Sequence, residues 1–334
     1  MRIETIKGHD ELLSLKDDWN RLTTDDRHTV FSKYPFIKNW HEQYRSFVEL
    51  EIMLGIKDNK IIGIAPLVND QGVMRFAGNN DCKEPIWDYA DFIVGKDDSE
   101  EFYDSVFKKI GNRHFHLEEI KQDSGLMDYF SSKRNVSINS GSNISSITLP
   151  SSFDEYFGSL EKGFQKDILY YDRKIAAAGL TLEMITAPIL GNARQLDEHL
   201  ERFFDLHQKV WMSKGESGFF TNTTEGERVK NLYRDLASDL LVSGNYFLST
   251  FKKGDECVAM WQGFKDEKTA YAYATIINPD YKNLSPGKIL LMKTLQHFIG
   301  TQHTTFDLLR GNDAYKAKLC SVMGNNYVIA DGRT

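Results

Sequence analysis

Length, composition and charge place the chain among ordinary globular proteins. Its 334 residues are enough for two compact domains, and 41% hydrophobic with 27% charged residues exclude a disordered or fibrous protein. The formal net charge of −7 argues against a general nucleic-acid binder, so no DNA partner is expected.

The sequence shows no sign of export, membrane insertion or metal binding. The stretch from Met1 to Ile6 lacks the apolar run of a signal peptide, and no apolar segment reaches the ~20 residues that cross a bilayer. We therefore expect a cytoplasmic protein without a membrane span. Cys82, Cys257 and Cys320 are odd in number and far apart, which fits neither a disulfide framework nor a metal site.

A helix and an antiparallel hairpin are predicted early in the chain. The helix lies around Pro35–Tyr44. Apolar runs over Glu49–Ile56 and Ile61–Val68 flank a polar turn at Lys57–Lys60, and a third strand follows at Val73–Phe76.

The next predicted helix opens with acidic residues. Its start, Gly95–Glu101, contains four carboxylates. These suit the positive end of a helix dipole, but they would repel a bound pyrophosphate. We therefore expect no phosphate-linked ligand at this helix.

A domain boundary is predicted near residues 139–150. Ser140–Asn143 is a small polar patch that indicates a linker, and the expected domains are residues 1–145 and 146–334. Ser151 or Ser152 is expected to cap a helix over Phe153–Leu160.

A basic helix follows over Lys162–Ala178, and Gly179 is expected to end it. One flank carries Lys166, Tyr170, Arg173 and Lys174, which are spaced i, i+4, i+7 and i+8. A solvated charged face and a surface that binds a ligand or a partner both remain open interpretations.

The hairpin design recurs in the second half. A helix around Leu196–Trp211 precedes strands at Tyr246–Phe251 and Glu256–Phe264, with a turn at Lys252–Asp255 and a third strand at Thr269–Ile276. The repeat is too long for a solenoid unit and indicates a duplicated α/β (α+β) domain, in which a mainly antiparallel sheet is flanked by helices.

A second kind of helix start follows this third strand. Ser285 is a natural N-cap, Pro286 suits the first helical position, and no acidic residue occupies the start. Gly287 is expected to leave the first amides open, and Lys282 and Lys288 add positive charge. These five residues are the predicted phosphate site, because a helix N-terminus attracts anions.

The chain resembles the GNAT-fold acetyltransferases related to cellulose and exopolysaccharide biosynthesis enzymes. The residues that carry the resemblance are Ser152–Tyr156, Phe204–His207 with Trp211, Leu284–Gly287, Phe306–Gly311 before Tyr315-Lys316, and Asp88–Phe92. The resemblance implies two tandem GNAT-like domains, with acetyl-CoA or another acyl-CoA as co-substrate in the second and no metal. The family's pyrophosphate loop, Arg/Gln-x-x-Gly-x-Gly/Ala, matches residues 282–287 strictly only at the last glycine. The first domain is then a degenerate copy that shapes the acceptor cleft.

The resemblance also suggests catalytic roles. Tyr315 lies where a GNAT tyrosine often protonates the leaving thiolate. Asp307 could deprotonate the amine, bind its ammonium or pair with Arg310, and His207 could be a base or a packed histidine beside Trp211. Residues expected to contact the substrate are Trp211, Arg310, Lys166, Arg173 and Asp88. The basic helix over Lys162–Ala178 could meet the acceptor, the 3′-phosphate of CoA, an acyl-carrier protein or tRNA, or could be a solvated charged face.

Three functions follow as hypotheses. The first is acyl transfer from acyl-CoA to a small-molecule amine, such as an amino sugar or amino acid. The second keeps the tandem fold but uses aminoacyl-tRNA, as in the Fem-type peptidoglycan aminoacyltransferases. The third is a non-catalytic binding protein.

Overall fold

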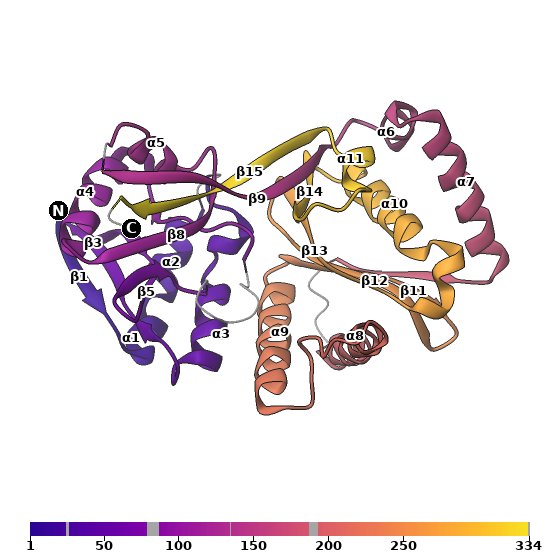
Figure 1. Cartoon of the computed structure of the whole chain (residues 1–334), viewed down its shortest axis with the longest axis horizontal. Coiled ribbons are helices and arrows are strands. Elements are labelled where there is room, and N and C mark those ends of the chain that lie inside the picture. The colour runs from indigo at the N-terminus through magenta and orange to yellow at the C-terminus, as the bar shows by residue number, and fades with distance from the viewer. Residues whose placement is uncertain (25–26, 79–86, 134, 187–192, 333–334) are drawn as a thin grey trace. The chain divides into compact units, whose positions relative to one another are not determined.

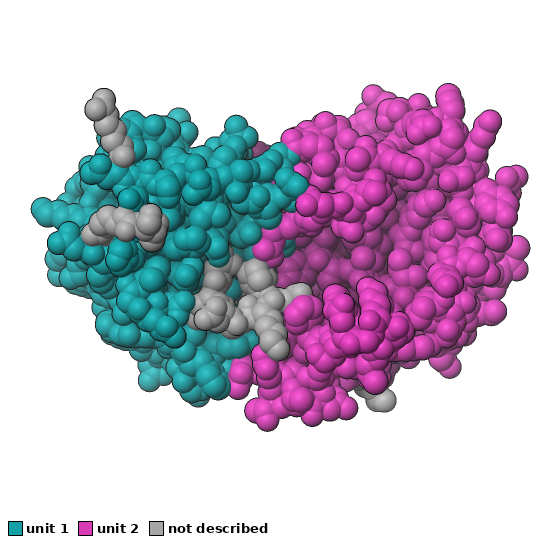
Figure 2. Space-filling view, viewed as in Figure 1, with its two compact units in different colours: residues 1–143, 324–334 teal, residues 144–323 magenta. Residues whose placement is uncertain are grey.

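The computed structural model describes residues 1–24, 27–78, 87–133, 135–186 and 193–332. The chain divides into two compact units, coloured separately in Figure 2: unit 1 is residues 1–143 with 324–334, and unit 2 is residues 144–323. The expected domains, 1–145 and 146–334, differ from this division mainly in the last residues, which belong to unit 1. Cys82 lies outside the described residues.

Unit 1 contains two sheets (Figure 1). The first has the antiparallel strand order β1-β3-β4-β7, and the second has the order β15-β8-β6-β5-β2, in which β6 and β8 run parallel. The helix α4 lies between β6 and β8 in the chain. The elements of unit 1 are β1 (Arg2–Ile6), α1 (His9–Ser14), α2 (Lys16–Leu22), η1 (Val30–Ser32), α3 (Tyr34–Tyr44), β2 (Glu49–Leu50), β3 (Ile52–Lys57), β4 (Lys60–Ala65), β5 (Leu67–Asp70), β6 (Val73–Phe76), β7 (Ile93–Val94), η2 (Lys96–Asp98), α4 (Ser99–Ile110), β8 (His114–Lys121) and α5 (Gly125–Ser131), with most of β9 (Val136–Thr148) and β15 (Val322–Asp331).

The first hairpin is confirmed, but each of its predicted strands is two strands. Asp58 and Asn59 form the turn with φ of 50° and 60°, as a two-residue turn between twisted strands requires. The first strand is interrupted at Glu51, whose buried carboxylate accepts a bond from Arg113 at 2.6 Å. The second is interrupted at Pro66, which has no backbone N–H to donate to a neighbour.

The predicted linker at residues 140–143 is wrong, because these residues lie inside strand β9. Asn325 of β15 supplies the reason. Its side-chain amide donates to Ser140 Oγ at 2.5 Å and to Asn143 Oδ1 at 3.2 Å. Polar side chains on an exposed strand face therefore find partners on a neighbouring strand, a contact that composition alone does not reveal.

Unit 2 is built on one sheet with the order β10-β11-β12-β13-β14-β9. Neighbouring strands are antiparallel, except that β13 and β14 run parallel with α10 between them in the chain. Figure 1 shows α10 and α7 over one face of this sheet and α8 and α9 over the other. The elements of unit 2 are α6 (Phe153–Ser159), α7 (Lys162–Ala177), β10 (Thr181–Ile185), α8 (Ala193–Ser213), α9 (Thr224–Val242), β11 (Tyr246–Lys253), β12 (Glu256–Lys265), β13 (Thr269–Ile277), η3 (Pro279–Leu284), α10 (Pro286–Ile299), β14 (Thr305–Arg310) and α11 (Lys316–Leu319).

Local sequence signals set several element ends in unit 2. Ser152 Oγ accepts from the amide of Glu155 at 3.2 Å and caps α6, as predicted. Gly179 follows α7 with φ of 71°, a left-handed conformation that costs glycine little. Leu291, Leu295 and Phe298 recur at helical spacing and are buried, so they form the inner face of α10.

Both units share one arrangement, a strand, a helix and a parallel strand: β6-α4-β8 in unit 1 and β13-α10-β14 in unit 2. The predicted fold class, mixed and mainly antiparallel sheets flanked by helices, is confirmed. None of the helices in the described part of the chain combines the length and apolar character that a bilayer crossing requires.

Candidate functional site

The parallel strands β13 and β14 pair briefly and then part. Pairing runs from Thr269 with Thr305 to Tyr271 with Asp307. Both strands are fully described, and β13 continues to Ile277 without further pairing to β14. We call the point of separation, at Tyr271 and Asp307, the fork. Beyond the fork β13 no longer pairs with β14, so this side of β13 is where a ligand could lie against the strand.

Asp307 lies at the fork, within the apolar strand β14, as the sequence indicated. Its side chain is 8% exposed, and Oδ1 accepts the amide of Leu309 at 2.7 Å. Leu309 has φ of 58°, and the register of β14 against β9 shifts between Asp307 and Arg310. The carboxylate therefore holds a β-bulge at the point where the strands part.

Lys316 is a residue whose role the sequence did not predict. It is 3% exposed, and Nζ donates to the backbone carbonyls of Leu308 at 2.9 Å, Leu309 at 3.3 Å and Arg310 at 2.6 Å. A buried ammonium with three carbonyl acceptors fixes the end of β14. The sequence held one signal of this position. The apolar residue Leu319 lies three residues after Lys316, so the two side chains share one face of α11, and both are buried.

Tyr315 and Cys320 complete a group that we call the fork cluster: Asp307, Tyr315, Lys316 and Cys320. Burial, and then Asp313 and Cys320, raise the pKa of Tyr315, so its hydroxyl keeps its proton at neutral pH. Burial raises the pKa of Cys320 to about 11, which makes it a thiol rather than a nucleophile. Lys316 lowers that pKa and Asp307 raises it, so both charges lie near the Cys320 thiol.

The start of α10 has the predicted residues in the predicted positions but an unusual cap geometry. Ser285 occupies the N-cap position with φ and ψ of 47°, a left-handed conformation, and its side chain forms no capping bond. The predicted cap position and first helical residue are therefore confirmed, but the serine side chain does not form a capping bond. The first intrahelical donor is the amide of Ile289, which bonds to Ser285 at 3.4 Å, and Pro286 has no N–H. The amides of Gly287 and Lys288 thus precede the hydrogen-bonded helix, with no acidic side chain in the first turn.

Gly287 joins this helix start to the end of β13. A Cβ there would lie 2.3 Å from Ile277 Cδ1, so the missing side chain lets the helix approach the strand. Trp261 Nε1 donates to the carbonyl of Gly287 at 3.2 Å. Gly287 itself is buried. Its close packing explains why the position is a glycine, and the sequence alone did not predict this packing. Lys282 is exposed at the end of η3, and Lys288 is partly buried in the first turn of α10.

The corresponding helix start in unit 1 is acidic and already paired. Lys57 Nζ lies 2.9 Å from Asp98 and 3.5 Å from Glu101. The carboxylates of this helix start therefore pair with Lys57. The corresponding helix start in unit 2 instead has backbone amides and lysines.

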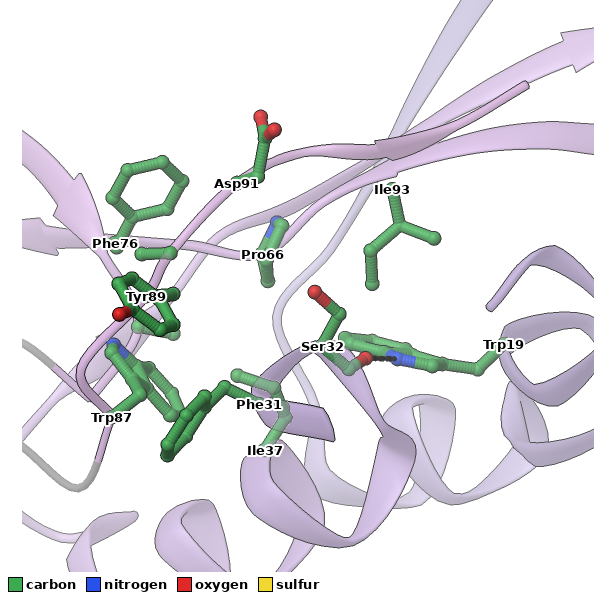
Figure 3. A pocket seen from close by; sticks show the side chains of 12 residues that line it. Trp19, Phe31, Ser32, Ile37, Pro66, Phe76, Trp87, Tyr89, Asp91 and Ile93 are labelled. Atoms are coloured by element: carbon green, nitrogen blue, oxygen red, sulfur yellow. Dashed lines mark hydrogen bonds between the residues drawn. The ribbon is translucent and has the colours of Figure 1, made fainter. Parts of the chain in front are cut away.

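Unit 1 has a small aromatic cavity of about 20 Å³ (Figure 3). Trp19, Phe31, Trp87 and Tyr89 line it, and Trp19 Nε1 donates to the carbonyl of Ser32 at 2.7 Å. The carboxylate of Asp91 points away from the rings. This volume has room for one water molecule and is too small for an acyl carrier or a sugar.

His207 lies in an aromatic cluster of unit 2. Its ring is within 6.1 Å, between ring centres, of Phe203, Trp211, Phe219 and Phe220. Burial first, and then Lys214, lowers the pKa of His207 to about 4, and Nδ1 has no hydrogen-bond partner among the described residues. The imidazole is therefore neutral at physiological pH.

This lowered pKa predicts a pH-dependent stability. The unfolded chain has the ordinary histidine pKa of about 6.5, so it takes up a proton before the folded protein does. The stabilisation is complete above that value and is lost as the pH falls towards 4. Between pH 7 and pH 5, we expect the free energy of unfolding of the natural protein to fall by about 2 kcal/mol more than that of His207→Phe. Urea unfolding at pH 7, 6 and 5 measures this, and parallel pH profiles would contradict it.

The other predicted substrate residues are spread over both units. Lys166 and Arg173 are exposed on α7, and Arg310 ends β14 with its carbonyl bound to Lys316. Asp88 is buried in unit 1, and its backbone carbonyl accepts from Asn326 at 2.8 Å. Within unit 2, the carbonyl of Arg310 therefore contacts Lys316, and Asp307 and Tyr315 each lie near Cys320.

Comparisons with known proteins bear on the fold of the chain. Residues 162–317 match the family described as the acetyltransferase (GNAT) domain. The chain is similar to the crystal structure of FemX, with a TM-score of 0.63, 11% identity, and 98% of this chain and 97% of that chain covered. It is also similar to a conserved protein of unknown function from Bacteroides thetaiotaomicron (TM-score 0.62, 12% identity, 96% and 97% covered) and to L-PGS from Bacillus licheniformis (0.56, 9%, 89% and 91%). At these identities the structural likeness shows the fold alone. A comparison with curated protein sequences finds no match.

Proposed function

We propose that this chain, in which residues 162–317 match the GNAT acetyltransferase domain and whose fold is similar to that of FemX, is an N-acyltransferase that moves an acyl group from acyl-CoA to the amine of a small molecule. An amino sugar or an amino acid is the expected acceptor class. The observation that carries the proposal is the combination, in one unit, of amides that precede the first intrahelical bond of α10 and a strand fork with a buried carboxylate.

The donor's pyrophosphate would bind at the start of α10. The amides of Gly287 and Lys288 point out of a helix N-terminus, where partial positive charge favours anions. Lys282 and the Lys288 ammonium add charge. Because Gly287 packs on Ile277 at the end of β13, an acyl arm bound there would extend along the part of β13 that does not pair with β14, towards the fork.

The transfer itself needs three functions at the fork. The amine nitrogen attacks the thioester carbonyl, a C–N bond forms, the C–S bond breaks, and the CoA thiolate leaves. Asp307 would attract the ammonium form and receive its proton, directly or through water, while Tyr315 would protonate the thiolate. A backbone amide of β13 near the fork would stabilise the oxyanion. His207 is assigned a contact with the acceptor beside Trp211, since a pKa of about 4 makes it a poor base for an ammonium group.

Titration calorimetry with acetyl-CoA and longer acyl-CoAs tests the donor assignment. We expect Lys288→Glu to weaken binding about 10-fold, because it places a carboxylate beside the proposed pyrophosphate. Lys96→Glu is the matched control, since Lys96 is exposed at the corresponding helix start of unit 1 and undergoes the same charge change. If folded protein binds none of the acyl-CoAs, the donor assignment is wrong.

A further inference from the structure

The helix α7 has one face with an unusual composition. Lys162, Lys166, Leu169, Tyr170 and Arg173 share this side of the helix, and we call them the α7 face. Leu169 is 51% exposed and Tyr170 is 50% exposed, although both are large and apolar. The three cations are also exposed. In a protein with a net charge of −7, a local surface that is cationic and apolar is a candidate interface.

The acidic side chains of α7 lie away from this face. Asp167 approaches Lys288 at 3.9 Å and Asp172 pairs with Lys293 at 3.0 Å, and both lysines belong to α10. Their charges are therefore directed towards the neighbouring helix, and the α7 face has no acidic member.

The α7 face also lies close to the proposed donor site. Lys288, in the first turn of α10, has its Nζ 5.0 Å from the ring of Tyr171 and 5.3 Å from the ring of Phe164, on the inner side of α7. The outer face is thus about one helix diameter, ~10 Å, from the start of α10. A partner bound to α7 could place a flexible phosphate-linked arm at those amides.

We propose that the α7 face docks an acidic acyl-carrier protein, which presents its acyl group to the fork on a phosphate-linked thioester arm. The inference rests on the proposed acyltransferase function and names the partner that delivers the donor. The chemistry is the same as for acyl-CoA: the C–N bond forms, the carrier's C–S bond breaks, and the carrier thiol leaves with a proton.

The composition of the face favours a protein over a nucleic acid or a lipid surface. A nucleic acid would use the cations and stack on Tyr170, but it gains little from the exposed Leu169. A membrane-binding helix presents a continuous apolar side, whereas here only two large apolar residues lie among three cations. A partner protein with an acidic rim around a small apolar patch would complement both the cations and the exposed apolar side chains of the α7 face.

The experiment titrates labelled bacterial acyl-carrier protein, in its apo form and its phosphopantetheine-bearing holo form, into the full chain and follows anisotropy. We expect binding that weakens with ionic strength. Lys166→Glu/Arg173→Glu should weaken binding of both forms at least about 10-fold, and Leu169→Ala/Tyr170→Ala should weaken it as well. Lys288→Glu should affect the holo form only. The control is Lys108→Glu/Lys109→Glu, which makes the same charge change on exposed positions of α4.

The outcomes separate this inference from the proposed function. Acyl-CoA binding and transfer without carrier binding would overturn the docking proposal and leave the acyltransferase intact. Carrier binding that the α7 variants do not change would also overturn it. Anionic phospholipid vesicles and tRNA are titrated in parallel at low salt, and tighter binding of either, lost in the same variants, would assign the face to that partner instead. A loss of acyl-CoA binding in Lys166→Glu/Arg173→Glu would place those cations in the donor site.

Discussion

Replacing Lys316 by methionine is expected to lower the free energy of unfolding by about 4 kcal/mol, a large effect for a single substitution. The ammonium is buried and donates to three carbonyls at the end of β14. Methionine has a similar length but no donor, so these acceptors would be left in a site with little access to water. Urea unfolding of both proteins at pH 7 measures the difference.

The control for this experiment is Lys318→Met. Lys318 lies two residues further along α11 but is exposed, so we expect a change below about 0.5 kcal/mol. If Lys316→Met does not fold, Lys316→Gln preserves one amide donor and should be destabilised less. A change of under about 1 kcal/mol in Lys316→Met would show that the ammonium does not hold the strand end.

Asp307→Asn is expected to reduce kcat/KM for acyl transfer about 100-fold while preserving the fold. The asparagine carbonyl can still accept the amide of Leu309, so the bulge should survive and stability should change by less than about 1 kcal/mol. The negative charge that would attract the ammonium and take its proton is lost. Thiol release from acyl-CoA, measured with a panel of small amines, gives the rate.

Two further variants separate charge from structure at the fork. Asp307→Ala removes the acceptor as well as the charge, so it should lose activity and stability together. Tyr315→Phe removes the proposed acid without changing the ring, and its effect should be greatest for poor leaving thiols. If Asp307→Asn and Tyr315→Phe both retain the full rate, the fork residues are not catalytic. Retention of the protein's function in the cell by both variants would instead favour the binding-protein hypothesis.

Much of the fold can be predicted from the sequence, because its signals are local. The Asp58-Asn59 turn, the Ser152 cap and the Gly179 helix end each depend on the conformation of a few consecutive residues. The contrast between the two helix starts is also local, since acidic or open first turns can be read along the chain. The acidic start of α4 and the open start of α10 both lie where they were predicted.

Contacts between distant segments could not be predicted in this way. The strand character of residues 140–143 depends on Asn325, and the interruption of the first hairpin strand depends on Arg113. A single sequence carries no record of which remote segment supplies a partner, and a polar run reads as a loop when its partners are unknown.

The start of α10 and the fork contain both kinds of feature: some follow from the local sequence, and others depend on tertiary contacts. The amino-acid order alone predicts that a helix begins at Ser285-Pro286-Gly287 without acidic residues, because proline and charge act within one turn. Tertiary contacts make Gly287 pack against Ile277 and bury Lys316 under the end of β14, and the left-handed conformation of Ser285 is likewise known only from the folded chain. Burial and close approach depend on which surfaces meet after folding, whereas helix starts depend on neighbouring peptide groups.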